Sequence, residues 1–409
     1  MHPLNPQKGG FILKKRSIFS WLFVLILVFE SIIGGSSSVF AQVNHSNEAE
    51  ITEPQIIDLG SPIQTAQTID AVYGQEDGAN IVYTTVTGSA SSGDWAKFNV
   101  IDIDNQNLLA SFPLEGASNA WSHAITPDGR VFIGASNKMF VYSPHTNEVV
   151  DLGVPISGTS SIWSLTTDEN GNVYGGIYSP SIGGRIFRID AETLEITDLL
   201  GESVDAAEDY IRSIAYYDGY VYAGTGSANG RVWKINPETK EKVRIELPGT
   251  PDDPIYQGRY DRMGSVYGMT VVDHYLFAFF NGPSIIRVYD LQKQEWREKG
   301  LTNIRGLMAV TGEYNGKVYT SKRDNNMWEI DIETLEEKIA MPFEGSSIRN
   351  SKWMEVQNQT EFEGPAMVTI SYDGKVVLAD PVNQKRVILP SLVDGQPLNL
   401  QAMETGPDG

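Results

Sequence analysis

The chain contains no cysteine among its 409 residues, so it can form neither a disulfide nor a thiolate metal site. Histidine is scarce as well: there are five, and no two have the short spacing typical of zinc ligands. The sequence also lacks a glycine-rich phosphate loop and a Gly-x-Ser-x-Gly nucleophile motif. These absences predict a protein without a metal or another cofactor.

Positive charge is also in short supply. The first 41 residues hold four Lys or Arg side chains and one Glu, so the remainder carries 27 basic and 51 acidic side chains, a net charge of −24. Such a charge repels nucleic acid and anionic lipid. After residue 41 no apolar run is long enough to span a bilayer. We therefore expect neither a nucleic acid partner nor a membrane span in the mature protein.

The N-terminal 41 residues have the pattern of a bacterial secretory signal. A basic cluster at residues 14–16 precedes the apolar run 18–29, and small residues then lead to Ala41. An uncleaved membrane anchor is the alternative. However, Glu30 interrupts the apolar run, and a stable transmembrane helix requires about 20 apolar residues. The sequence predicts cleavage after Ala41 and a secreted, extracellular protein. Residues 42–54 are expected to be a flexible segment and residues 55–409 the folded domain.

One strand–turn–strand pattern occurs seven times. Each copy has a second hairpin before it, such as the one turning at Asp218–Gly219, so each unit of about 45 residues has four strands, A to D. No segment after residue 41 has an apolar period typical of a helix. Four-stranded units at this period predict an all-β fold, a β-propeller. The turn residues of the seven copies are Asp102, Ser143, Asp190, Asn236, Asp290, Asp331 and Asp380.

The two ends of the domain carry extra strand patterns. Residues 56–63 nearly copy residues 149–156, which form a D strand and its exit, while residues 398–403 resemble an A strand. Orphan strands at 55–60 and 398–403 would share one blade, close the ring and cover its edges. The sequence thus predicts seven complete blades and a split eighth. Since it stops inside the first turn of that blade, it also indicates truncation at the C-terminus.

The repeats resemble those of secreted bacterial β-propellers with loose, non-WD blade motifs. Residues 125–134 look like a blade of streptogramin-lyase-like propellers, and residues 211–226 look like blades found beside cell-wall and polysaccharide-active modules. The resemblance covers most of residues 55–409 and lies in strand and turn positions. It implies the β-propeller fold, and it carries no local signature of a particular function.

The loops from D to A and from B to C share one face of a propeller, here called the top face. At the top ends of the A strands, the equivalent residues are all aromatic, Arg or Gln. Such a ring offers flat faces for sugar rings and guanidinium groups for carboxylates. Packing between blades is the alternative for its bulky members. The ring consists of Trp121, Trp163, Arg212, Tyr267, Arg305, Trp353 and Gln401.

The longest D–A connection, residues 248–265, adds Arg259 and Tyr260 to the top face. Long loops are often functional, although an insertion whose charges pair with local Asp residues would look the same. We predict a non-catalytic module that binds an anionic polysaccharide or cell-wall glycan on this face. A polysaccharide lyase, with His123 and Tyr267 as acid and base, is one alternative. A scaffold for a protein partner is the other.

Overall fold

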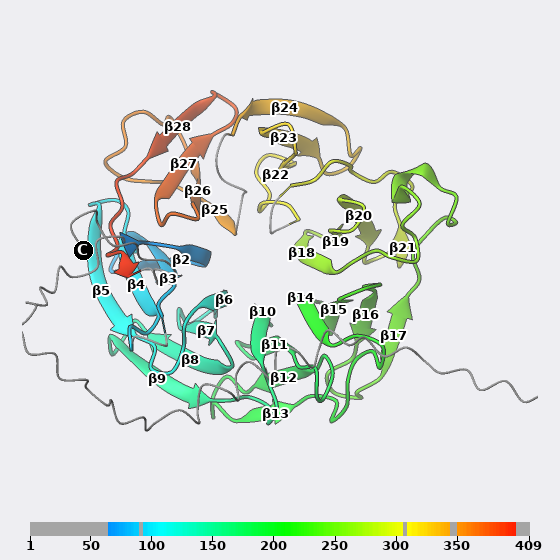
Figure 1. The fold of residues 1–409 in the computed structure, drawn as a ribbon. Helices are drawn as coiled ribbons and strands as arrows, with labels where there is room; N and C mark the ends of the chain where they lie inside the picture. The colour runs from blue at the N-terminus through cyan, green and yellow to red at the C-terminus, as the bar shows by residue number, and fades with distance from the viewer. Residues whose placement is uncertain (1–63, 90–92, 306–308, 344–349, 398–409) are drawn as a thin grey trace, which may run out of the picture. The chain divides into compact units, whose positions relative to one another are not determined.

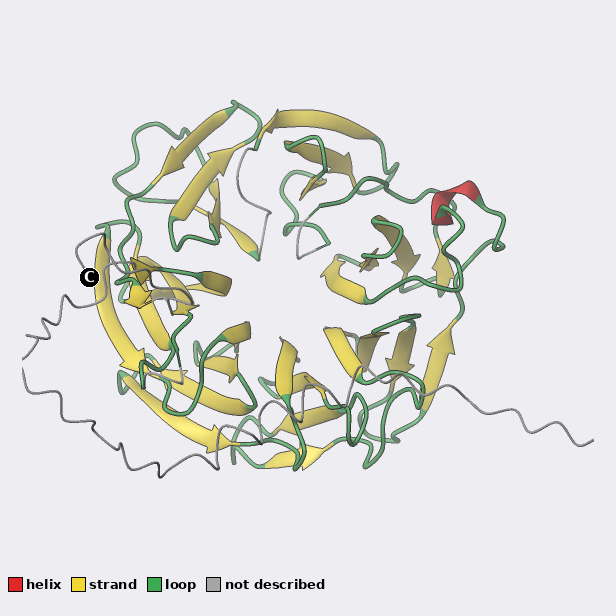
Figure 2. Cartoon of the chain, viewed as in Figure 1, coloured by secondary structure: helices red, strands yellow, loops and turns green. Residues whose placement is uncertain are grey.

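The computed structural model describes residues 64–89, 93–305, 309–343 and 350–397, which all belong to the unit Leu59–Gly409. Strands dominate this part of the chain, and its one helix is a single 3₁₀ turn, η1 (Pro254–Tyr256) (Figure 2). The all-β prediction is confirmed. Within these ranges no helix has the length and apolar character that crossing a bilayer requires.

Antiparallel sheets of consecutive strands stand around a common centre, with the first strand of each sheet innermost (Figure 1). This arrangement is a β-propeller, as the repeats predicted. Four sheets have four strands each. They are β2 (Thr68–Glu76), β3 (Ala79–Val86), β4 (Lys97–Asp102) and β5 (Asn107–Pro113); β6 (Ala120–Ile125), β7 (Val131–Ala135), β8 (Lys138–Ser143) and β9 (Glu148–Gly153); β18 (Val266–Val272), β19 (Tyr275–Phe280), β20 (Ile285–Asp290) and β21 (Glu295–Trp296); and β25 (Ser351–Met354), β26 (Ala366–Ile370), β27 (Val376–Asp380) and β28 (Lys385–Ile388).

The remaining strands form sheets of other sizes. An eight-stranded sheet consists of two groups of four that one residue pair, Tyr178 with Tyr210, joins. A three-stranded sheet also receives two backbone bonds from outside its strands: Arg305 N donates to Ser321 O and Thr311 N donates to Tyr319 O, each at 2.9 Å. The eight strands are β10 (Ser161–Thr167), β11 (Val173–Tyr178), β12 (Ile186–Ile189), β13 (Ile196–Asp198), β14 (Tyr210–Tyr217), β15 (Tyr220–Gly226), β16 (Val232–Ile235) and β17 (Lys242–Ile245); the three are β22 (Lys317–Ser321), β23 (Asn326–Asp331) and β24 (Glu337–Pro342); β1 (Gln64–Thr65) pairs with β29 (Gln396–Pro397).

Burial is greatest in the second strand of the sheets and least in the outermost strand. The second strands β7 and β19 are buried along their whole length, because both of their faces pack against neighbouring sheets. The outer strand β5 alternates exposed and half-buried residues, since one of its faces meets solvent. This gradient explains why the inner hairpins are more apolar in sequence than the outer strands.

The predicted turns are held by their Asp and Asn side chains. At the turn after β23, the Asp331 carboxylate accepts hydrogen bonds from the amide and hydroxyl of Thr334, at 2.8 and 2.9 Å, and pairs with Lys317. These contacts, the Lys317 hydrogen bond first among them, hold the pKa of Asp331 far below its ordinary value. The repeated turn residue is therefore a structural acceptor.

We expect Asp331→Asn to lower the stability at neutral pH by about 0.5–1 kcal/mol, the range of a partly exposed ion pair. Because the pKa is lower in the folded state, the contribution is present above the unfolded pKa of about 4 and is lost as pH falls through the folded value. Melting temperatures of both proteins between pH 7 and strong acid will therefore converge towards the acid end. A difference that persists unchanged in acid would show that the ion pair is not its cause.

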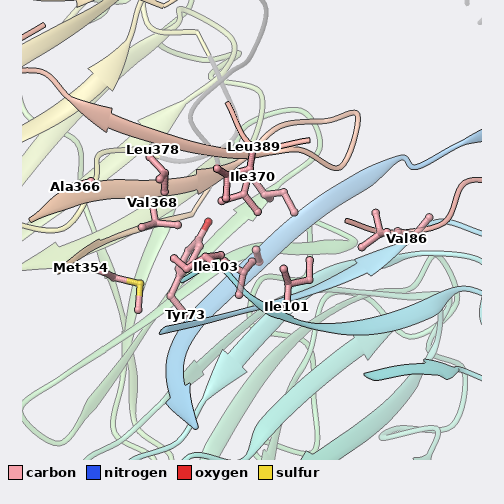
Figure 3. Packing of buried hydrophobic residues seen from close by; sticks show 14 residues of the cluster. Tyr73, Val86, Ile101, Ile103, Met354, Ala366, Val368, Ile370, Leu378 and Leu389 are labelled. Carbon is pink, nitrogen blue, oxygen red and sulfur yellow. The ribbon is translucent and has the colours of Figure 1, made fainter. Parts of the chain in front are cut away.

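The first and last of the four-stranded sheets pack directly on each other. Their shared core joins β2 to β4 with β25 to β27, through residues such as Tyr73, Ile101 and Val368 (Figure 3). Hydrogen bonds reinforce this joint: Tyr73 Oη donates to Asn350 O at 2.7 Å, and Thr68 Oγ1 donates to Ser371 O at 2.6 Å. The described strands thus close into a ring between β2–β5 and β25–β28.

The Asp104 side chain also links the two sheets of this joint by hydrogen bonds. Its carboxylate accepts from Asn80 N and Asn80 Nδ2, at 2.8 and 3.1 Å, and from Gln357 N at 2.7 Å. Asp104 is 4% exposed and Asn80 is 3% exposed. The proposed split eighth blade, residues 55–60 with 398–403, lies outside the described residues.

Glycine at position 175 is required by close packing inside the eight-stranded sheet. A Cβ built there would lie 2.0 Å from Cζ of Phe187, its partner on β12, and Phe187 is fully buried. We expect Gly175→Ala to destabilise the fold by about 1–3 kcal/mol, the usual cost of overpacking. Denaturant unfolding will measure it, and adding Phe187→Leu should recover part of the loss. Gly364→Ala, where nothing lies within 4 Å, is the control and should be nearly neutral.

Candidate functional site

Four innermost strands carry a β-bulge at the same place. The pairing register shifts between Ala120 and Ser122 in β6, and at the matching points of β10, β14 and β18. Bulges leave one residue unpaired and re-aim its side chain, and they are common beside functional sites. The unpaired residues are Trp121, Trp163, Arg212 and Tyr267, four of the seven members of the ring predicted from the sequence.

These four residues line one cavity at the centre of the ring, with a volume of about 450 Å³. The cavity is also lined by Ile69 and Asp70 of β2, which lie at that strand's own register shift. Five innermost strands therefore contribute equivalent positions to one space. The repeat predicted this convergence, because the same strand position returns once in every sheet.

The four side chains form one cluster of aromatic rings around a cation. The guanidinium carbon of Arg212 lies 4.0 Å from the ring centre of Tyr267 and 4.5 Å from that of Trp163. Trp121 packs on Trp163 with ring centres 4.4 Å apart, and Arg212 lies 5.9 Å from its ring. The aromatic surface continues from Trp163 to Tyr210, 5.8 Å away. Rings in such an array offer apolar faces to the cavity and hold the guanidinium by cation–π attraction.

Arg212 is 9% exposed, and among the described residues no carboxylate forms an ion pair with it. Its burial lowers the pKa of the guanidinium, and the hydroxyl of Tyr267 is the largest influence in the opposite direction. Arginine nevertheless remains protonated at any physiological pH. The cavity thus holds a desolvated positive charge whose partners are aromatic faces and phenol groups.

In β2, β6, β10 and β14 a polar side chain within or directly after the register shift bonds to the next sheet. Ser122 Oγ accepts from Leu165 N at 2.7 Å, Ser164 Oγ accepts from Ile214 N at 3.0 Å, and Asp70 Oδ2 accepts from His123 N at 2.7 Å. These bonds fix the relative height of neighbouring innermost strands, and so position the ring of side chains. The sequence analysis did not single out these residues, although the Ser that follows each of Trp121, Trp163 and Arg212 was a visible signal.

His123 borders the cavity, but its ring is enclosed by protein. Its side chain is completely buried, with Nδ1 3.1 Å from Asp70 Oδ2 and Nε2 2.8 Å from Thr85 Oγ1. The sequence analysis offered this ring as an acid or base of the lyase alternative, and the structure encloses it between β2–β5 and β6–β9. Both ring nitrogens already have partners within the protein.

Other members of the predicted ring lie apart from the cavity. Trp353 stacks on Tyr314, with ring centres 4.4 Å apart, and donates from Nε1 to Gly312 O at 3.2 Å. Trp353 therefore packs between two sheets, the alternative that the sequence left open. Arg305 is exposed and bonds to Asn325 Oδ1, while Gln401 lies outside the described residues.

The two residues that the sequence predicted from the long loop between β17 and β18 have different surroundings. Tyr260 donates to Leu247 O at 3.2 Å and meets the buried Tyr256 edge to face, so it packs the loop onto the sheet below. Arg259 is exposed and donates to Gly282 O at 3.0 Å. Within the described ranges, no group of three or more His, Asp or Glu side chains is placed to hold a metal ion.

No protein-family model matches this chain, and no curated protein matches it in sequence. Solved structures do resemble it. Virginiamycin B lyase from Staphylococcus aureus is 13% identical, with a TM-score of 0.56 over 77% of this chain and 96% of that one. A catalytically inactive variant of that enzyme with quinupristin is 14% identical, with the same TM-score over 77% and 95%.

A second kind of β-propeller is about as similar. The β-propeller domain of Cps50 (Swd1) from Myceliophteria thermophila is 10% identical, with a TM-score of 0.53 over 76% of this chain and 94% of that one. At these identities the likeness concerns the fold alone. The class of the protein is therefore the β-propeller, and propellers of unlike function share its architecture.

Proposed function

We propose that this protein binds an acidic glycan in the central cavity, with Arg212 receiving a carboxylate of the ligand. The observation that carries the proposal is the buried guanidinium of Arg212, which lies between two aromatic rings and lacks an ion pair with any described carboxylate. A desolvated charge without a countercharge is costly for folding. Groups held in such positions are often kept for a ligand.

The aromatic faces support a sugar ligand in particular. Trp121, Trp163 and Tyr267 are half-buried, so each leaves part of its ring to the cavity. Flat apolar faces suit the C–H faces of a pyranose ring, while a guanidinium bonds a carboxylate through two parallel hydrogen bonds. The combination fits a uronic acid better than a neutral sugar or a free inorganic anion.

The test is a titration of the secreted, full-length protein with paired probes. Galacturonic and glucuronic acid oligomers are compared with neutral oligomers of the same length by calorimetry. We expect acidic probes to bind about tenfold or more tightly than neutral ones, since one charge-assisted contact contributes about 1.5–3 kcal/mol. Equal affinity for both classes, or no binding of either, would reject the proposal.

We do not carry the lyase alternative forward as a second function. Proton transfer needs a group within hydrogen-bond reach of the substrate, and the ring of His123 is buried with both nitrogens bonded, one to Asp70 and one to Thr85. The same titrations, followed in the ultraviolet for unsaturated products, test this directly. Product formation by the wild-type protein would restore the lyase assignment.

We also propose that the ring has seven blades. The four four-stranded sheets, the two halves of the eight-stranded sheet and the three-stranded sheet make seven groups, and the first and last groups share a core. A complete additional blade would have to stand between those two. Class averages from electron microscopy along the ring axis will count the blades, and eight would contradict this inference.

Export is a further proposal, and it depends on the N-terminal sequence. A basic cluster, an apolar run and small residues before Ala41 favour cleavage at that point. Mass spectrometry of the protein recovered outside the cell should find Gln42 as its first residue. A product that retains Trp21 would instead identify an anchor.

A further inference from the structure

Exposed arginines gather on the top face beside the cavity. Arg259 comes from the loop before β18, Arg323 lies between β22 and β23, and Arg305 lies in the connection between β21 and β22. Each of these places is at the end of the sheets where the innermost strands begin. All three side chains are exposed, although the protein has 52 acidic and only 31 basic residues.

Two of these arginines meet on one loop. Arg259 Nη1 donates to Gly282 O at 3.0 Å, and Arg323 Nη2 donates to Ser284 Oγ at 2.6 Å, so both contact the segment between β19 and β20. Arg305 bonds to Asn325, which lies two residues beyond Arg323. Two guanidinium groups therefore contact residues 282–284, and the third, that of Arg305, contacts the loop that carries Arg323.

The same loop adjoins the cavity wall. Asn281 Oδ1 accepts from Ser265 N at 2.8 Å, and Gly282 N donates to Met263 O at 3.0 Å. Ser265 lies two residues before Tyr267, whose ring contacts Arg212 in the cavity. A ligand that extends out of the cavity past Tyr267 thus reaches the arginine surface, defined here as Arg259, Arg305 and Arg323.

Among the described residues, these arginines bond to neutral groups and form no ion pair with an acid. The described arginines that pair with carboxylates are Arg130, Arg185, Arg188 and Arg244, all away from this loop. The nearest acid in sequence, Asp324, already accepts from Trp328 Nε1 at 3.0 Å and from Asn326 N. A backbone carbonyl or an amide oxygen uses one or two of the five N–H groups of a guanidinium, which leaves others for an anion.

We propose that the arginine surface binds a linear polyuronate. The terminal sugar unit of this chain occupies the cavity, and the uronate units after it contact the arginines. This inference rests on the proposed function and adds to it that the ligand is a chain with repeated carboxylates, recognised at one end. The repeated charges of such a chain complement three separated guanidinium groups, which a single uronic acid cannot engage together. Each additional contact made by a tethered residue raises affinity through effective concentration.

The experiment compares galacturonic acid with its trimer and hexamer on the full-length protein. For the wild type we expect the affinity to rise about tenfold or more from monomer to hexamer, as linked contacts act together. Raising the salt concentration should weaken the hexamer most, since exposed charges are screened. The variant R259Q/R305Q/R323Q should bind the monomer as the wild type does and lose the gain with length.

A matched variant removes three exposed basic groups elsewhere, which controls for net charge. Its substitutions are Lys240→Gln, Lys293→Gln and Arg386→Gln. Its affinity for galacturonate should still rise with the length of the glycan. Melting temperatures of both triple variants, expected within a few degrees of the wild type, verify folding. An acidic surface of a second copy of this chain is the alternative partner for the arginine surface. Sedimentation of the wild type tests whether such a dimer forms.

The outcomes separate the two proposals. If no galacturonate of any length binds, the cavity proposal fails. If the monomer binds and R259Q/R305Q/R323Q keeps the full gain with length, the cavity proposal stands and the arginine surface is rejected. A wild-type dimer that the triple variant loses would assign the surface to self-association and also overturn this inference.

Discussion

Replacing Arg212 by methionine is expected to remove acidic-glycan binding and to leave the melting temperature unchanged or higher. Methionine fills a similar volume and packs well against aromatic rings, so the cluster with Trp163 and Tyr267 keeps most of its contacts. The substitution also removes a buried charge, whose desolvation opposes folding. Affinity for a uronate should fall about 10- to 100-fold, because a charge-assisted contact is lost.

A lower affinity together with an unchanged or higher melting temperature distinguishes a ligand-binding role of Arg212 from a packing role. If Arg212 serves the fold, Arg212→Met will lower the melting temperature, and binding per folded molecule will not change. Arg212→Lys should keep the charge but lose the two-pronged hydrogen bond, with an intermediate affinity. Arg287→Met is the matched control, since Arg287 is also an arginine buried in the fold, 3% exposed, and does not line the cavity. Its affinity for glycan should equal that of the wild type.

Replacing Asp104 by alanine is expected to give the largest loss of stability among single substitutions at the joint. The carboxylate accepts three hydrogen bonds from Asn80 and Gln357 in a buried position. Its removal leaves donors without an acceptor, at about 1–3 kcal/mol each. We expect a total of about 2–5 kcal/mol from chemical denaturation. Glu363→Ala, which removes an exposed acid from the connection between β25 and β26, is the control and should change little.

Hydrogen exchange shows where Asp104→Ala acts. Amides of β2, β3 and β26 at the joint should exchange faster than in the wild type, while β14 and β15 on the other side of the ring should keep their protection. Equal acceleration in every sheet would mean that Asp104 stabilises its own turn and not the closure of the ring.

The repeat made most of this fold predictable. Turn residues such as Asp331 and Asn236 recur at one point of each unit, so the strands between them could be placed from chemistry that is local in sequence. The same periodicity identified Trp121, Trp163, Arg212 and Tyr267 as equivalent, and the structure brings them together in one cavity. Equivalent positions in a repeat take equivalent places in the fold, which is why the sequence predicted that these four residues lie together.

The rest of the site depended on information that the period does not contain. Trp353 occupies a comparable place in its unit, but its ring turns to Tyr314 of the neighbouring sheet. His123 follows its bulge by two residues, and whether it faced the channel depended on Asp70 and Thr85, which come from a different unit. Contacts between units are set by side-chain packing at long range, and spacing along the chain does not encode them.

The closure of the ring has a consequence during synthesis of the chain. The bonds at the joint link residues 253 to 303 positions apart, whereas neighbours within a sheet are close in sequence. Contacts of such separation form late, because the intervening chain must first be ordered. At about 5–20 residues per second, the first sheet waits roughly 15–60 seconds for the last to emerge. Until then, Ala71, Val82 and Ile101 present an open apolar face, the surface on which a holding chaperone would bind.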